Sequence, residues 1–354
     1  MNSFISEINV KAYRGLNNLF INNLGRINLL VGDNNSGKTS VLEVLKILSQ
    51  PKDLGTICTT ALSRNLAEKR DNFIDTVLSI FQKDSIDDED NKNMRQTYFM
   101  DLSCVCDAKH IGLEVIAEVK EKYFLNKEVD NLDNGISRVL EGSLKANIDG
   151  DKEAVVFSLD NDVSIDDAEE VYKSIFVPIN VSLYRSCVIL YSQVIKEDKK
   201  DDFIKILKIF DENITDISVV EKTIWIHSST KNTMPLFSYG AGMQKALLIA
   251  IAILKAKDGI LLVDEIETAI HTSALREVFE FVLKACYELN VQLFATTHSI
   301  EIIDKLLECQ QEYLEDIRVI TLTNSDGKSK TFARVLDGET AREERKEYNL
   351  ELRV

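Results

Sequence analysis

Residues 32–39 read Gly-Asp-Asn-Asn-Ser-Gly-Lys-Thr, and this stretch decides the fold that we expect for the chain. It fits the pattern G-x-x-x-x-G-K-[ST], a glycine-rich loop that joins a buried strand to a helix and binds phosphate. The apolar run at 27–31 predicts the strand, and apolar residues at helical spacing from Val41 to Leu48 predict a helix that ends before Pro51. A chance match in an ordinary turn would lack both neighbours, so the sequence favours a phosphate-binding loop.

The residue types of this loop predict how it would hold a nucleotide. The two glycines let backbone N–H groups turn toward the phosphates, and the N-terminus of the next helix adds the positive end of its dipole. Lys38 is expected to reach the β- and γ-phosphates, and the Thr39 hydroxyl is expected to bind Mg²⁺. The expected nucleotide contacts run along the whole loop: Gly32, Asn34, Asn35, Ser36, Gly37, Lys38, Thr39 and Ser40.

Two carboxylates follow another apolar run, at 259–263. A continuous apolar strand suits a parallel sheet covered on both faces, and such sheets bind ligands at the carboxyl ends of their strands. Asp264 is therefore expected to share the Mg²⁺ site with Thr39, and Glu265 to polarise the attacking water. The alternative is a pair of solvated carboxylates at a strand end, but the pairing with a phosphate loop favours the functional interpretation.

His298 follows the next apolar strand, at 291–296. A histidine in this position can donate a hydrogen bond to the γ-phosphate or hold the attacking water, so we expect it to act with Glu265. A lone histidine at a strand end is more often structural, and only its place beside the other motifs favours catalysis. Ser299 is the expected N-cap of a helix that runs to Leu307.

A glycine-rich turn leads into the most apolar helix of the chain. The turn holds Ser238, Gly240 and Gly242, and the run from Ala246 to Leu254 is apolar on all sides, so the helix should be buried. The N-terminus of such a helix, with glycine N–H groups around it, is a second anion site.

The remaining elements are weaker signals. Arg14 precedes a turn and could be solvated or reach the nucleotide, the first being slightly favoured. The stretch 84–93 is rich in acidic and amide residues and indicates a solvated loop. No sustained heptad pattern is present, so no long coiled coil is expected. Strands are predicted near 8–13, 19–22, 98–106, 113–119, 153–159, 223–227, 318–322 and 331–335, and helices near 66–81, 186–195, 203–210, 272–289 and at the charged C-terminal end.

Composition limits the compartment and the partners. The chain has 354 residues, 45% of them hydrophobic, and a formal net charge of −16, so DNA binding would need a local basic patch and is expected to be weak. Six scattered cysteines lack metal-ligand spacing and are expected to be buried free thiols. The N-terminus lacks the pattern of a secretory signal, and the longest apolar run is too short to span a bilayer. These features predict a soluble cytoplasmic protein without membrane contacts.

Taken together, the motifs resemble the ABC-class ATPase head of SMC, RecF and OLD (overcoming lysogeny defect) proteins. Asn-Leu-Leu-Val-Gly-Asp-Asn-Asn-Ser-Gly-Lys-Thr, Asp-Glu-Ile-Glu-Thr-Ala-Ile-His and Phe-Ala-Thr-Thr-His-Ser are similar to the OLD branch. The resemblance implies an α/β P-loop head with a mixed sheet and an antiparallel N-terminal lobe. The head would comprise residues 1–120 and 232–354, and residues 121–231 would form a small, mostly helical insertion of unknown role.

The resemblance also implies a homodimer or higher oligomer that binds ATP and Mg²⁺ between two heads and hydrolyses ATP slowly. Ser238, Gly240 and Gly242 would then contact the γ-phosphate held by the partner's loop. Tyr239 interrupts the family's usual L-S-G-G pattern, which leaves the register of these contacts open. The glutamine that senses Mg²⁺ in the family is either Gln82 or Gln193.

Three functions compete on this basis. Only about 50 residues follow the helix after His298, too few for the Toprim nuclease domain of OLD proteins. The chain therefore resembles stand-alone ATPase subunits of bacterial anti-phage systems such as PARIS and Septu, in which a separately encoded effector, such as a nuclease, acts. A RecF-like repair ATPase is the alternative, which the net charge disfavours. A transporter ATPase is disfavoured by the OLD-like motifs.

Overall fold

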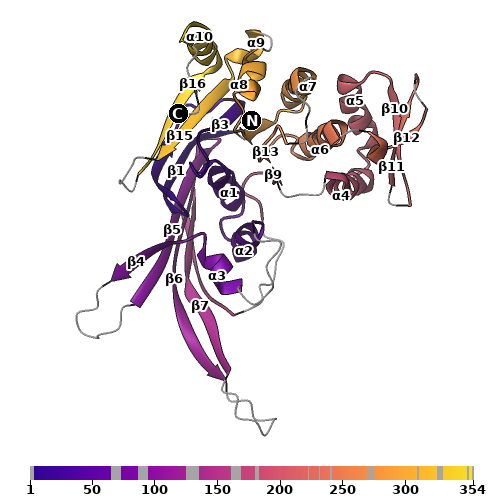
Figure 1. Ribbon diagram of the computed structural model, residues 1–354. Helices are drawn as coiled ribbons and strands as arrows, with labels where there is room; N and C mark the ends of the chain where they lie inside the picture. Colours follow the sequence, from indigo (N-terminus) through magenta and orange to yellow (C-terminus); the bar gives the residue numbers. More distant parts are fainter. Residues whose placement is uncertain are drawn as a thin grey trace.

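Two sheets organise the molecule, and the helix after the glycine-rich loop lies between them (Figure 1). The structure is a computed structural model, and its description covers residues 4–64, 73–86, 95–124, 135–160, 169–179, 183–221, 223–230, 232–239, 241–268, 270, 275–308, 311–324, 330–348 and 351–352. Within these residues the fold is α/β, as the sequence predicts.

The central six-stranded sheet is built from the continuous apolar runs. Its order is β16-β15-β3-β14-β13-β9, and every neighbouring pair is parallel except β15 with β16. All residues of β3, β13 and β14 are buried, because helices cover one face while α1 and the second sheet cover the other. The strands are β3 Ile27–Val31, β9 Ser174–Val177, β13 Ile260–Val263, β14 Gln292–Thr296, β15 Ile317–Asn324 and β16 Thr331–Asp337.

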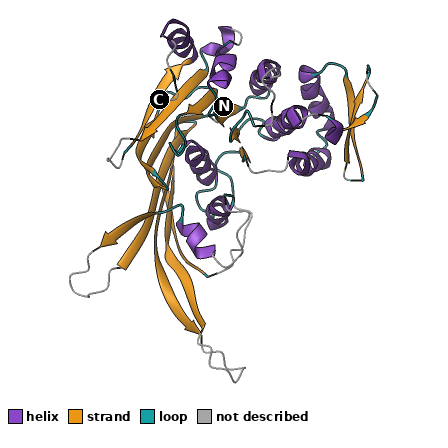
Figure 2. Cartoon of the chain, viewed as in Figure 1, coloured by secondary structure: helices purple, strands orange, loops and turns teal. Residues whose placement is uncertain are grey.

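The second sheet is antiparallel and carries the N-terminal strands. Its order is β2-β1-β5-β6-β7-β8, with β4 paired to β5 beside this path. Strands β5, β6 and β7 run well past the helices and form a long arm (Figures 1 and 2). The strands are β1 Ile5–Tyr13, β2 Leu16–Ile21, β4 Gln82–Ile86, β5 Arg95–Cys106, β6 Lys109–Phe124, β7 Gly135–Ile148 and β8 Asp151–Leu159.

Helices cover the sheets and support a small third sheet. The buried helix α6 packs against α4, α5 and α7, and the hairpin of β10 and β11 lies beyond α5 (Figure 1). None of the described helices combines the length and apolar character of a membrane span. The helices are α1 Lys38–Ser49, α2 Leu54–Leu62, α3 Phe73–Leu78, α4 Leu183–Lys196, α5 Lys200–Phe210, the 3-10 turn η2 Leu236–Ser238, α6 Ala241–Lys255, α7 Leu275–Glu288, α8 Ile300–Leu307, α9 Gln311–Leu314 and α10 Gly338–Tyr348; the third sheet holds β10 Ile214–Val220, β11 Thr223–Ser228 and β12 Met234–Pro235.

Most predicted elements are confirmed, and three differences lie before residue 90. Residues 84–86, predicted as loop, belong to β4, because β5 supplies hydrogen-bonding partners for this polar run. Helix α2 was not predicted; Asp53 caps it by accepting hydrogen bonds from two backbone N–H groups. Of the helix predicted at 66–81, only α3 falls within the described residues, and residues 79–81 turn out of it.

The middle of the chain is not mostly helical. Strands β7 and β8 extend the antiparallel sheet, and β9 forms the edge of the central sheet beside β13. Helices α4 and α5 are the helical part of residues 121–231 that the structure describes. Short strands with half-exposed residues, such as β9, lack a clear alternation, and the pairing partner decides their conformation.

The Gln292 side chain joins the two sheets. It stands at the start of β14, is 1% exposed, and accepts a hydrogen bond from the Ile5 N–H at 2.8 Å. Its amide nitrogen donates to the carbonyls of Ile5 at 2.9 Å and Gly25 at 2.8 Å. One amide thus satisfies three backbone groups that are shielded from water, which is how buried polar groups avoid their desolvation cost.

We expect Gln292→Leu to lower the free energy of unfolding by roughly 2–4 kcal/mol, because three buried backbone groups lose their partner. Urea unfolding followed by circular dichroism measures this change. The control is Gln193→Leu on the exposed face of α4, for which we expect a change of no more than about 0.5 kcal/mol. Equal stabilities of the two variants would contradict a linking role for Gln292.

Candidate functional site

The glycine-rich loop between β3 and α1 has a backbone that only glycine fits at two positions. Gly32 has φ +140° and Gly37 has φ +99°. A Cβ atom at Gly32 would lie 2.5 Å from the Leu322 carbonyl oxygen, and one at Gly37 would lie 2.3 Å from Leu16 Cδ2. The sequence pattern therefore encodes a loop packed against β15 and β2, with no room for larger residues.

The Lys38 side chain lies back over this loop. Its Nζ donates to the carbonyls of Gly32 and Asp33, each at 2.8 Å, and the residue is only 4% exposed. Burial lowers the pKa of the Lys38 ammonium, and the carboxylates of Asp33 and Asp264 oppose that shift. The loop thus concentrates a positive charge where its backbone already favours anions.

Thr39, at the start of α1, is bonded to the carboxylate that follows β13. Its Oγ1 donates to Asp264 Oδ1 at 2.9 Å, although the two residues are 225 positions apart. Thr296, at the end of β14, donates to the same oxygen at 2.7 Å. Asp264 is 3% exposed and so lies fixed between two hydroxyl groups. The structure brings Thr39 and Asp264 together, as the sequence predicts.

Glu265 has a left-handed backbone conformation, and its carboxylate has different partners from that of Asp264. Its φ is +43°, and its N–H donates to Thr296 Oγ1 at 2.8 Å. One carboxylate oxygen accepts a hydrogen bond from Thr268 at 3.2 Å, and the other lies 3.8 Å from His298 Nε2. Glu265 and His298 are both about one-third exposed, so this pair faces solvent at the strand ends.

Three further residues at this edge were missing from the sequence prediction. The Thr296 hydroxyl donates to the Asp264 carboxylate and accepts from the Glu265 N–H, as described above. Glu267 Oε1 accepts hydrogen bonds from Thr297 Oγ1 at 2.8 Å and from the His298 N–H at 3.0 Å. Lys245, on α6, is 1% exposed and is attracted by the Glu267 and Asp264 carboxylates. A lone lysine at the start of an apolar helix was the one sequence signal that could have identified it.

The described residues of the predicted second anion site lie at the N-terminal end of α6 and in the turn before it. Ser238 is exposed at the end of η2, and Gly242 lies in the first turn of α6. Gly240 lies outside the described residues. No interaction among the described residues joins Ser238 to the glycine-rich loop of its own chain. A role of Ser238 and Gly242 in binding an anion therefore stays a prediction.

Neither candidate glutamine contacts the acidic edge in the described part of the chain. Gln82 donates to the carbonyls of Arg14 at 3.2 Å and Leu16 at 2.7 Å, and so supports the strand turn behind Gly37. Gln193 is exposed on α4. Gln82 therefore bonds to a residue, Leu16, that packs against the glycine-rich loop.

Arg14 is neither solvated nor directed at the loop. It shares the buried carboxylate of Glu43, on α1, with Arg64 and Tyr13: the two arginine Nε atoms donate at 2.9 and 2.7 Å, and the Tyr13 hydroxyl donates at 3.1 Å. Burial raises the pKa of the Tyr13 hydroxyl, so it stays protonated and donates. The group fixes α1 from behind, because Glu43 is 1% exposed and its charge is neutralised.

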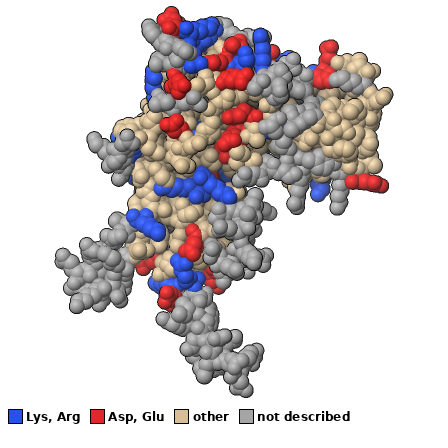
Figure 3. All heavy atoms as spheres, in the orientation of Figure 1, with Lys and Arg blue, Asp and Glu red and all other residues tan. Residues whose placement is uncertain are grey.

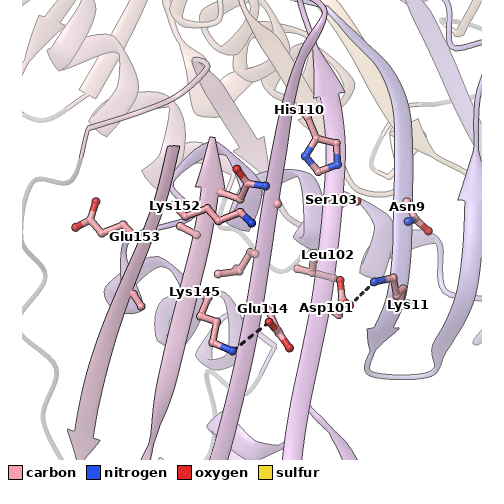
Figure 4. Close-up of a pocket in the computed structure, with 15 residues that line it drawn as sticks. Asn9, Lys11, Asp101, Leu102, Ser103, His110, Glu114, Lys145, Lys152 and Glu153 are labelled. Carbon is pink, nitrogen blue, oxygen red and sulfur yellow. Dashed lines mark hydrogen bonds and ion pairs between the residues drawn. The ribbon is translucent and has the colours of Figure 1, made fainter. Parts of the chain in front are cut away.

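A separate hollow of about 540 Å³ lies on the open face of the antiparallel sheet (Figure 4). Four of its charged side chains form two ion pairs: Lys11 lies 2.7 Å from Asp101, and Lys145 lies 3.6 Å from Glu114. On the face shown in Figure 3, Lys and Arg form separate groups among Asp and Glu. This described face therefore offers no continuous basic band for nucleic acid.

Two family models match the chain. The model described as "AAA domain, putative AbiEii toxin, Type IV TA system" matches residues 107–304, which is more than half of the chain. The model described as "AAA ATPase domain" matches residues 4–173. Together they span residues 4–304, which include the antiparallel sheet, the central strands β3, β9, β13 and β14 and the strand ends described above, but not β15 and β16.

Curated relatives and solved structures add two kinds of similarity. The proteins MJECL11 and MJECL10 of Methanocaldococcus jannaschii are 44% identical over 69 residues and 41% identical over 49 residues. These stretches are 20% and 14% of this chain, and they span 60% and 22% of the relatives.

The SMC head domain of Thermotoga maritima superposes with a TM-score of 0.50 at 10% identity, covering 94% of this chain and 99% of that one. An SMC head bound to the C-terminal winged-helix domain of ScpA gives 0.49 at 11% identity, covering 96% and 99%. The first of these structures shows that the chain has the fold of an SMC head.

Proposed function

Because the chain belongs to the family of AAA-domain proteins described as "AAA domain, putative AbiEii toxin, Type IV TA system", we propose that it binds and hydrolyses ATP with Mg²⁺. The observation that carries this proposal is the hydrogen bond from Thr39 to Asp264. It joins the glycine-rich loop to the acidic strand end, the two parts that a phosphate site with a metal requires.

The side chains present fit both ATP and Mg²⁺. The loop of residues 32–37 and Lys38 would hold the phosphates, with Ser40 at the next position of α1. The Thr39 hydroxyl and the Asp264 carboxylate are oxygen ligands, which Mg²⁺ prefers, and few of them are needed because phosphates and water fill its shell. Bound Mg²⁺ would neutralise charge on the phosphate oxygens.

Glu265 is the residue best suited to take a proton from the attacking water. Its carboxylate accepts a hydrogen bond from Thr268, whereas the carboxylate of the proposed metal ligand Asp264 is held by Thr39 and Thr296. His298, 3.8 Å from that carboxylate, can hold the same water or a phosphate oxygen from the other side. We assign catalysis to these two residues.

Glu265→Gln should keep ATP binding while lowering turnover by roughly 10²- to 10⁴-fold, because only the proton acceptor is lost. Lys38→Ala should instead weaken ATP binding by roughly tenfold or more, because a charge-assisted contact is lost. Titration with a fluorescent ATP analogue and a phosphate-release assay measure the two effects. Lys11→Ala, an exposed lysine on β1, is the control and should change neither. Wild-type turnover by Glu265→Gln would contradict the assignment of the base.

We also propose that each ATP lies between two copies of the chain. Ser238 and Gly242 stand at a second helix N-terminus, apart from the loop that holds Lys38. In a head-to-head pair, the segment at 238–242 of one copy would complete the phosphate site of the other. The exposure of Ser238 supports this arrangement, since a residue that contacts a partner must be accessible.

Mixing Lys38→Ala with Ser238→Arg tests this arrangement. Each variant alone has no intact site, whereas a mixed dimer has one, so an equal mixture should recover about a quarter of wild-type activity if the sites act independently. Turnover and crosslinking across the pair are measured on the same samples. An active enzyme that stays monomeric at all concentrations would exclude the shared site.

We further propose that the ATPase controls a separately encoded effector, such as a nuclease, in bacterial anti-phage defence. The family description names a toxin of a toxin–antitoxin system, which supports this role over RecF-like repair. The net charge of −16 and the mixed charges of Figure 3 support weak DNA binding. The described cysteines, all free and buried, support a reducing compartment, the cytoplasm.

Cells that carry the chain and its adjacent gene should resist phage, and Glu265→Gln should abolish that resistance without changing the amount of protein. Plaque counts with and without the adjacent gene measure the effect. Tight binding of the purified chain to duplex DNA, with a steep dependence on salt, would favour the RecF-like alternative instead.

A further inference from the structure

The turn that follows β13 is fastened to a single residue, Thr296 at the end of β14. The Glu265 N–H donates to the Thr296 hydroxyl at 2.8 Å, and the Ile266 N–H donates to the Thr296 carbonyl at 3.1 Å. The same hydroxyl donates to Asp264 Oδ1 at 2.7 Å. Thr296 is 1% exposed, so water competes little for these bonds. Three successive residues, 264–266, are therefore all bonded to one residue of the neighbouring strand.

The chemistry of the hydroxyl fixes the direction of its two bonds. A backbone N–H can only donate, so the Thr296 oxygen must accept from Glu265, and its single proton is left for the Asp264 carboxylate. A valine in this place would have nearly the same shape and would make neither bond. Only a side chain with a hydroxyl can therefore serve both neighbours from the end of this buried strand.

Glu265 has a backbone conformation that needs such support. Its φ is +43°, in the left-handed region that residues with a Cβ atom rarely adopt. Strained residues of this kind persist where their surroundings over-determine them, and they concentrate at functional sites. The hydrogen bond from the Glu265 N–H to Thr296 restrains the rotation that φ describes. Without that bond, Glu265 can relax to a negative φ, which would displace its carboxylate.

We propose that Thr296 is a positioning residue that holds the proposed metal ligand Asp264 and the proposed base Glu265 in one fixed arrangement. This inference rests on the proposed ATPase function for its kinetic part only. The hydroxyl bonds to the side chain of the first residue and to the backbone of the second, so it sets where the two carboxylates stand relative to each other. A site arranged in advance in this way needs no reorganisation at the moment of reaction.

The first test uses the protein without nucleotide. Thr296→Val removes the hydroxyl and keeps the shape of the side chain, so the Glu265 amide hydrogen should exchange with solvent roughly fivefold faster or more. Thr296→Ser keeps the hydroxyl and should exchange at close to the wild-type rate. Hydrogen exchange followed by mass spectrometry, on fragments that resolve residues 264–268, measures the effect. Wild-type exchange at Glu265 in Thr296→Val would overturn the proposal.

Thr321→Val is the matched control for this test. Thr321 lies on β15 of the same sheet, is 3% exposed, and donates its hydroxyl proton to the Leu352 carbonyl. Both valine variants lose a buried hydrogen bond, and each should lower the melting temperature by a few degrees. Only Thr296→Val should speed exchange at Glu265, which separates the local effect from a general loss of stability. An equal rise in the two variants would count against the proposal.

The second test measures the kinetic consequence. Thr296→Val should lower ATP turnover roughly 10- to 100-fold while the Kd for ATP stays within about threefold, because the base is displaced and the phosphate loop is intact. Thr296→Ser should recover most of the turnover, and Thr321→Val should match wild type. A phosphate-release assay and titration with a fluorescent ATP analogue measure the two quantities. Wild-type turnover by Thr296→Val, or turnover by Thr296→Ser as low as that of Thr296→Val, would overturn the positioning role.

Failure of this inference is distinguishable from failure of the proposed function. If the wild-type chain neither binds nor hydrolyses ATP, the ATPase proposal fails, while the exchange of the Glu265 amide still decides whether the Thr296 hydroxyl holds the turn. If Thr296→Val does not fold, Thr296→Ala takes its place in both tests, again compared with Thr296→Ser. A folded variant without the hydroxyl that exchanges and turns over like wild type would exclude the proposal.

Discussion

The hydrogen bonds at Asp264 constrain the rest of the structure. Thr39 follows β3 and Asp264 follows β13, and these strands are not neighbours, because β14 lies between them. Their side chains can meet only if the three strands end at one level and the middle strand ends in a short polar residue. The parallel register provides the level ends, and Thr296 provides the hydroxyl. The helices on both faces then bury these strands and keep the register fixed.

The same edge shows how the fold accommodates buried charge. Lys38 and Lys245 are both buried beside the acidic strand end, and burial lowers the pKa of each ammonium while the carboxylates nearby oppose that shift. Glu43, on α1, forms ion pairs with Arg14 and Arg64. Ion pairs of this kind add little net stability, but removing one partner is costly. They therefore fix geometry: α1 is held in place at its first turn by Thr39 and in its second turn by Glu43.

Sequence reasoning succeeded where the residues alone determine the structure. The apolar runs of β3, β13 and β14 and the loop at 32–39 predicted the central sheet and the meeting of Thr39 with Asp264. It failed where the neighbouring strand determines the conformation of a segment. Strand β4 is polar and exists because β5 pairs with it, and β7 and β8 are placed by their neighbours rather than by a strong pattern. Thr296 and Glu267 lie within the stretches that carry the family resemblance, but their roles were not predicted, since only the folded chain shows what they bond.

The long antiparallel sheet has a mechanical consequence. Strand β6 contains 16 residues, which in extended form span about 50 Å, and α1 packs against this sheet near its base. A tilt of about 5° at the base would therefore shift the far end by roughly 4 Å, with no bond broken inside the sheet. Shifts of less than 1 Å beside the phosphate-loop helix would therefore become displacements of several ångström at the far end of the sheet.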